Sequence, residues 1–197
     1  MVVETKLIGN PSEIEDFLGV SIPKNLLNHG NKVEKTDFLS IDQPRTLLPE
    51  KGPFLFFAEK PIAVVYFSET IAILARMDVL PEFCIGHFNG DDDFESRPNL
   101  PLYFIGGAAG QLCSIYTALA KNDRRFMPEA PSGSAESRGE DLIDEGSKLL
   151  FFVSLVKHTK RGYDFSYKVF QDGNEVAAGE VSTISVPKQV VFKKKKG

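Results

Sequence analysis

The longest uncharged segment of this chain constrains its fold more than any other feature. It runs from Asn99 to Ala120 without a single Asp, Glu, Lys or Arg residue. Apolar side chains recur within it at three- and four-residue steps, at Ile105, Ala108, Leu112, Ile115 and Leu119. This spacing predicts a helix over residues 102–121 that is apolar on nearly every face.

Such a helix is either a membrane span or the buried core helix of a globular protein. Pro101 interrupts the start of the segment, and glycine and polar residues dilute the rest of it: Gly106, Gly107, Gly110, Gln111, Ser114 and Thr117. A bilayer span is usually a more continuous apolar run. The sequence therefore favours a core helix wrapped by protein, and we expect no membrane association.

Strand patterns lie on both sides of this helix. Residues 61–67 and 70–77 are rich in β-branched and aromatic side chains, residues 149–156 are continuously apolar, and residues 163–169 alternate with a period of two. A turn at Gln171–Asn174 then leads into a last strand over 176–186, because Gly173 tolerates positive φ. Residues 122–146 are polar and predict a long loop, with room for one poor strand. The order predicts an α+β fold, an antiparallel sheet curled around one helix.

Charge and cysteine usage exclude several classes of partner. The net charge of −4 is too small to steer a polyanion, so nucleic acid is not expected. Cys84 and Cys113 have neither a zinc-ligand spacing nor a disulfide framework. Residues 1–6 lack the basic segment and apolar run of a signal peptide. We therefore expect a cytoplasmic protein without a bound metal.

Three motifs, taken in order, connect the chain to a known family. The first is the segment Leu47-Leu48-Pro49-Glu50-Lys51-Gly52-Pro53-Phe54-Leu55, and the second is Gly86-His87-Phe88-Asn89-Gly90. The third is Arg97-Pro98-Asn99-Leu100-Pro101, followed by the helix with Ala108, Ala109 and Gln111. Together they resemble the β-hydroxyacyl-acyl-carrier-protein dehydratase family of fatty-acid elongation, over roughly residues 45–186.

The resemblance implies a hot-dog fold, in which an antiparallel β-sheet wraps around one long central helix. It implies a homodimer or higher even oligomer that binds an acyl thioester on acyl carrier protein or coenzyme A, with no other cofactor. We expect residues 47–190 to form the hot-dog domain, residues 1–46 an N-terminal extension packing on the core, and residues 191–197 a basic tail. In the extension, Asn10 to Glu13 look like a helix start, with Phe17 and Leu18 available for docking.

In the family, a histidine removes the proton α to the thioester carbonyl, and an acid on the partner's helix protonates the departing β-hydroxyl. The histidine corresponds to His87. The acid stands six positions after the helix-preceding proline, and here that position is Gly107. Pro101 and Gln111 match family residues on either side of this position with the same spacing, which fixes the alignment. The helix acid is therefore missing from this chain. Leu102 also replaces the glycine that opens the family's helix.

An acidic insertion offers a substitute for the missing acid. Asp91, Asp92 and Asp93 follow the histidine motif in a six-residue insertion that ends at Ser96. A solvated acidic loop is the default interpretation of these residues and of Glu95, and the alternative is that one of them supplies the missing acid. Metal binding is not expected, because the spacing lacks the alternation and later Glu of a calcium loop. The expected substrate-binding residues are Gly86, Phe88, Asn89, Gly90, Pro101, Leu102, Gly107 and Gln111.

Gly107 has two interpretations, close packing across a dimer or space left open for a bulkier acyl chain. The activity likewise has alternatives. The first is dehydration or hydration of a 3-hydroxyacyl thioester. The second is hydrolysis of acyl-CoA or acyl-carrier-protein thioesters, which needs a base but no donor to a β-hydroxyl. The third is a non-catalytic hot-dog subunit.

Overall fold

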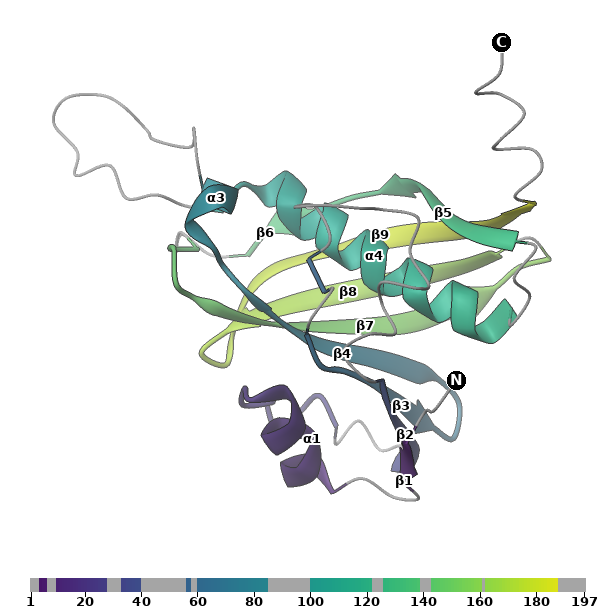
Figure 1. The fold of residues 1–197 in the computed structure, drawn as a ribbon, viewed down its shortest axis with the longest axis horizontal. Helices are drawn as coiled ribbons and strands as arrows, with labels where there is room; N and C mark the ends of the chain where they lie inside the picture. Colours follow the sequence, from purple (N-terminus) through teal and green to yellow (C-terminus); the bar gives the residue numbers. More distant parts are fainter. Residues whose placement is uncertain are drawn as a thin grey trace, which may run out of the picture.

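The computed structural model describes residues 4–6, 10–27, 33–39, 56–57, 60–84, 100–121, 126–138, 143–160 and 162–187. In this part of the chain, nine strands form one antiparallel sheet (Figure 1). The sheet order is β1 (Glu4–Lys6), β2 (Val33–Leu39), β3 (Ile62–Phe67), β4 (Ile71–Asp78), β7 (Lys148–His158), β8 (Gly162–Gln171), β9 (Asn174–Pro187) and β5 (Phe126–Gly133). The short β6 (Glu136–Ser137) also pairs with β9. The predicted α+β layout is confirmed.

The central helix is α4 (Leu102–Lys121), and it lies against β5 and β9 as Figure 1 shows. Ile105, Leu112 and Ile115 are fully buried in the main core, together with inward-facing residues of β3, β4, β7, β8 and β9. By length and composition alone α4 is a candidate membrane span, but 61% of its most apolar window is buried inside the protein. In the structure α4 is therefore a buried core helix, as the sequence predicts.

A second apolar layer covers the opposite face of the sheet. The helix α1 (Pro11–Leu18) begins after the cap Asn10, whose side chain accepts from Ser12 N, and it buries Ile14 and Leu18. Alternate residues of β3, β4 and β7 that point away from α4 complete this layer, including Leu74 and Phe152. Docking of Leu18 is confirmed.

Residues before position 47 do more than pack on the core. β2 pairs with β3 over most of its length, and β1 pairs with β2, so both strands extend the sheet itself. The sequence pattern did not indicate this pairing. The domain boundary near residue 46 stays a prediction, because residues 40–55 lie outside the described part of the chain, as do residues 191–197.

The polar stretch 122–146, predicted as a long loop with room for one poor strand, holds more strand structure than that prediction gave it. It contains the eight-residue strand β5, which pairs with β9 at the end of the sheet order. Pro128 and Pro131 have no backbone N–H to donate, so they are compatible only with an edge strand. The register with β9 shifts between Glu129 and Ser132, around Pro131. The predicted turn before β9 is confirmed, with Asp172 and Gly173 both at positive φ.

Candidate functional site

A groove of about 670 Å³ runs between α4 and β5, and we name it the inner groove. Its helix side consists of Gly106, Gly107, Gly110, Gln111 and Ser114. Its strand side consists of Ala130 and residues 132–135, with Val181 beyond them. The aromatic side chains of Phe56, Tyr103 and Phe104 line the end nearest the start of α4. The described lining carries no Asp, Glu, Lys, Arg or His side chain.

The glycines of α4 give the inner groove its width. A Cβ added at Gly107 would come within 3.6 Å of Phe56 Cε2, and one added at Gly106 or Gly110 would come within 3.7 Å of an alanine Cβ. These are ordinary van der Waals distances, so close packing within the chain would tolerate alanine at all three positions. Gly107 itself is exposed in the single chain. Its missing side chain therefore leaves open space beside the helix.

Gln111 shapes the wall of the inner groove. Its side chain is buried, and its Oε1 accepts a hydrogen bond of 3.0 Å from the backbone N–H of Phe56. Phe56 follows directly on the first family motif, so this bond ties that segment to the central helix. Gln111 thus lines the groove and also holds a backbone segment in place, and its role in substrate binding stays a prediction.

Pro101 and Leu102 occupy the start of α4 rather than the groove lining. Pro101 is buried and its carbonyl accepts a hydrogen bond of 3.0 Å from Phe104 N. Leu102 is half-buried against the main core. The leucine that replaces the family's glycine therefore packs inward at this turn.

The remaining predicted site residues lie outside the described part of the chain. They are Gly86, His87, Phe88, Asn89, Gly90, Asp91, Asp92 and Asp93. The residues on either side of this segment are placed. Phe83, in the short helix α3 (Pro81–Cys84), packs its ring 5.3 Å from Phe56 and 5.7 Å from Phe104, at the aromatic end of the groove. Leu100 is buried and donates to Ile143 O at 2.8 Å.

Cys113 is the one cysteine of α4, and the structure gives it a packing role. It is fully buried in the main core rather than in the groove lining. Burial raises the pKa of the Cys113 thiol well above its ordinary value. The side chain therefore stays a neutral thiol, as expected of a core residue. Among the described residues, no group of three or more His, Cys, Asp and Glu side chains could hold a metal ion.

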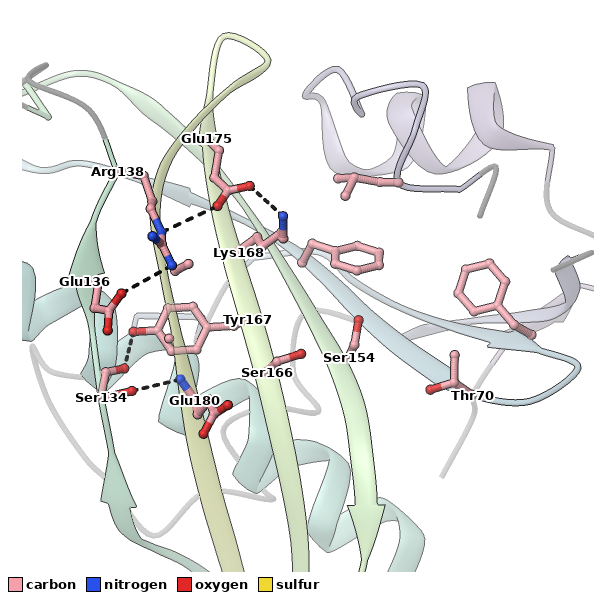
Figure 2. A pocket seen from close by; sticks show the side chains of 15 residues that line it. Thr70, Ser134, Glu136, Arg138, Ser154, Ser166, Tyr167, Lys168, Glu175 and Glu180 are labelled. Carbon is pink, nitrogen blue, oxygen red and sulfur yellow. Dashed lines mark hydrogen bonds and ion pairs between the residues drawn. The ribbon is translucent and has the colours of Figure 1, made fainter. Parts of the chain in front are cut away.

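A second groove, of about 640 Å³, lies on the other face of the sheet, and we name it the outer groove (Figure 2). Ser154 and Ser166 face each other across β7 and β8 on its floor, and Phe152 lies beside them. Its charged groups form a chain of ion pairs. Glu175 contacts Lys168 at 2.7 Å and Arg138 at 3.9 Å, and Arg138 contacts Glu136 at 3.2 Å.

Sequence reasoning missed the outer groove. The alternation over residues 163–169 does predict a polar outer face for β8. The walls, however, come from Leu26 in the N-terminal region and from Glu136 and Arg138 around β6. No local pattern in those segments indicates that they meet on one face of the sheet.

Comparisons with known proteins bear on the fold. No family model matches the chain, and no curated protein matches it in sequence. The dehydratase heterocomplex ApeI:P from Xenorhabdus doucetiae is similar in structure, with a TM-score of 0.56 and 16% identity over 81% of this chain and 99% of that one. A hot-dog-like protein from Thermanaerovibrio acidaminovorans has a TM-score of 0.51 and 14% identity, over 62% and 86% of the two chains.

A thioesterase superfamily member from Thermus thermophilus has a TM-score of 0.51 and 12% identity, over 64% of this chain and 90% of that one. Identities this low establish a shared architecture and leave the activity open. An antiparallel sheet wrapped along one long buried helix is what these structures have in common with this chain, which therefore has a hot-dog fold.

Proposed function

We propose that this protein binds an acyl thioester in the inner groove and acts on it as a 3-hydroxyacyl-thioester dehydratase-like lyase. The observation that carries the proposal is the groove beside Gly107, on the face of α4 where the family resemblance locates the reacting carbons. The described lining of the groove is uncharged and is aromatic at one end, which suits an acyl chain. The structural neighbours with this fold include a dehydratase heterocomplex and a thioesterase superfamily member.

Chain connectivity supports His87 as the base. Cys84 is buried at the end of α3, whose Phe83 packs at the aromatic end of the groove. His87 itself lies outside the described residues, three positions after Cys84 in the sequence. In the proposed reaction its neutral imidazole removes the proton α to the thioester carbonyl.

In the proposed reaction, one of Asp91, Asp92 and Asp93 protonates the β-hydroxyl as the C–O bond breaks. The α-proton goes to His87, the hydroxyl leaves as water, and the product is the enoyl thioester. A protonated carboxyl group is required for this step, and α4 carries none. A homodimer fits the same proposal, because Tyr103 is 66% exposed and Gly107 is exposed on the helix that the resemblance places at the interface.

Hydrolysis is the second candidate, and one observation favours it. The described lining of the inner groove contains no carboxylate, and hydrolysis needs only a polarised carbonyl and an activated water. His87 would then activate the water that attacks the thioester carbonyl, and the products would be a carboxylic acid and a free thiol. A non-catalytic subunit is the third alternative.

One pair of assays separates the three. Purified protein is given 3-hydroxybutyryl and crotonyl thioesters of coenzyme A, and enoyl absorbance and free thiol are followed in parallel. A change in enoyl absorbance without thiol release supports the lyase, and thiol release alone supports the hydrolase. His87→Ala should lower the rate by about 10²–10⁴-fold with the fold retained, as expected on losing a general base. Turnover that is unchanged in His87→Ala would contradict the assignment of the base, and absent turnover would leave the non-catalytic subunit.

A further inference from the structure

Ser114 is a buried polar residue in the wall of the inner groove. It lies on α4 seven residues after Gly107, which is about 10 Å further along the helix axis. Its side chain is 96% buried, since its relative exposure is 4%, and it belongs to the groove lining. Within the described part of the chain its hydroxyl has no hydrogen-bond partner, and its Oγ is not one of the side-chain atoms sealed from solvent without a partner, so it borders the open space of the groove.

The other buried hydroxyl on α4 is satisfied. Thr117 donates to the Cys113 carbonyl at 2.8 Å, and its oxygen lies 2.6 Å from that of Thr183 on β9. Most buried polar groups in proteins have such partners, because an unpaired one loses its hydrogen bonds to water on folding. Ser114 therefore differs from its neighbour in having a donor and acceptor directed toward a cavity.

The two ends of the inner groove differ in chemistry. Phe56, Tyr103 and Phe104 line one end, whereas Ser114 lies toward the other end, beyond Gly110 and the Ala130 side chain that faces Gly110. Ser134 is already engaged, because its Oγ accepts from Glu180 N at 3.2 Å and its carbonyl accepts from Tyr167 OH at 2.7 Å. A plain alkyl chain reaching Ser114 would bury the hydroxyl without giving it a partner.

We infer that Ser114 is a specificity-determining residue that selects acyl thioesters carrying an oxygen, as a hydroxyl or carbonyl, on the part of the chain distant from the thioester. This inference rests on the proposed function. The reacting carbons lie beside Gly107, and the chain extends along α4 until its oxygen meets the Ser114 hydroxyl. A site that hydrogen-bonds a substrate oxygen discriminates against an analogue lacking it, since the buried hydroxyl is then unpaired.

The test measures dissociation constants by calorimetry for matched thioesters of N-acetylcysteamine. Each unsubstituted acyl thioester is compared with a series of thioesters of the same acyl chain. Each member of the series carries one hydroxyl group, at a different carbon distant from the thioester. Wild-type protein should bind the best-placed hydroxylated chain about three- to tenfold more tightly than the unsubstituted one, the range expected for one net hydrogen bond. Hydroxyls at other positions should give no gain.

Two variants identify the residue responsible. Ser114→Ala should abolish the preference and bind unsubstituted chains at least as tightly as wild type does. Ser154→Ala is the matched control, because Ser154 lies in the outer groove on the other face of the sheet, and it should keep the full preference. A preference that persists in Ser114→Ala, or equal binding of all chains by wild type, overturns the inference. If no thioester binds at all, the proposed function itself fails.

Discussion

The inner and outer grooves are nearly equal in size, about 670 and 640 Å³, but they differ in the charge of their linings. In the outer groove the charged side chains of Glu136, Arg138, Lys168 and Glu175 pair with one another. The inner groove has no charged side chain in its described lining, and it keeps the unpartnered hydroxyl of Ser114. Cavity size alone therefore does not distinguish the two grooves, whereas the charge of their linings does.

Filling the inner groove should have the largest effect on activity. Gly107→Phe would project a ring into the open space beside α4, starting from a Cβ that the structure accommodates 3.6 Å from Phe56 Cε2. We expect kcat/KM for the thioester to fall roughly 100-fold or more, because the reacting carbons lose their position. The measurement is turnover of the substrate identified above, with circular dichroism to verify folding.

The matched control places the same ring in the other groove. In Ser154→Phe the added ring lies on the outer face of the sheet. Turnover should stay within about twofold of wild type, as expected for a surface change away from the reacting groups. Equal losses in the two variants would remove the functional distinction between the grooves.

Removing the Gln111 amide should have the next largest effect, on stability. Gln111→Leu leaves the N–H of Phe56 buried without its acceptor, which lies 3.0 Å away in the native protein. We expect the free energy of unfolding to fall by about 1–3 kcal/mol in urea titrations. Gln111→Glu keeps an acceptor oxygen at the same reach and should lose less. If the two variants were equally unstable, the hydrogen bond to Phe56 would not be what the side chain contributes.

A smaller change at Gly107 should have the opposite sign. Gly107→Ala adds a methyl group in an ordinary contact and removes a glycine from a helix interior, so we expect a gain of up to about 1 kcal/mol in the free energy of unfolding. Gly179→Ala is the contrasting variant, because a Cβ there would collide with the Ser134 carbonyl oxygen. It should destabilise by about 1–3 kcal/mol. Destabilisation by Gly107→Ala would show that α4 needs this glycine for packing.

The elements with strong periodicity were predictable from the sequence. Helix α4 and strands β3, β4, β7, β8 and β9 follow from apolar spacing and from the turn at Gly173. Strand β5 was indicated only as room for one poor strand, because Pro128 and Pro131 contradict strand propensity, and its place in the sheet depends on pairing with β9. The pairing of β2 with β3 is a contact between distant segments that local patterns do not contain.

Of the residues that line the inner groove, the resemblance singled out Gly107 and Gln111 as substrate-binding, and that role stays a prediction. Ser114 was visible in the sequence only as a residue that dilutes an apolar helix. Its significance depends on β5 closing the groove opposite it and on the absence of a nearby acceptor. Such information is three-dimensional, and no spacing within α4 supplies it.

The smallest expected effect concerns the ion pairs of the outer groove. Glu175→Gln removes the carboxylate that contacts both Lys168 and Arg138, whose side chains are 52% and 53% exposed. Exposed ion pairs contribute little, so we expect a loss of only about 0.2–1 kcal/mol in the free energy of unfolding, diminishing at high salt. A double-mutant cycle with Lys168→Gln, measured at low and high ionic strength, isolates the pair. Thioester turnover should not change, because these charges satisfy each other on the face of the sheet away from α4. A loss of turnover in Glu175→Gln would contradict the separation of the grooves and give the outer face a part in the reaction.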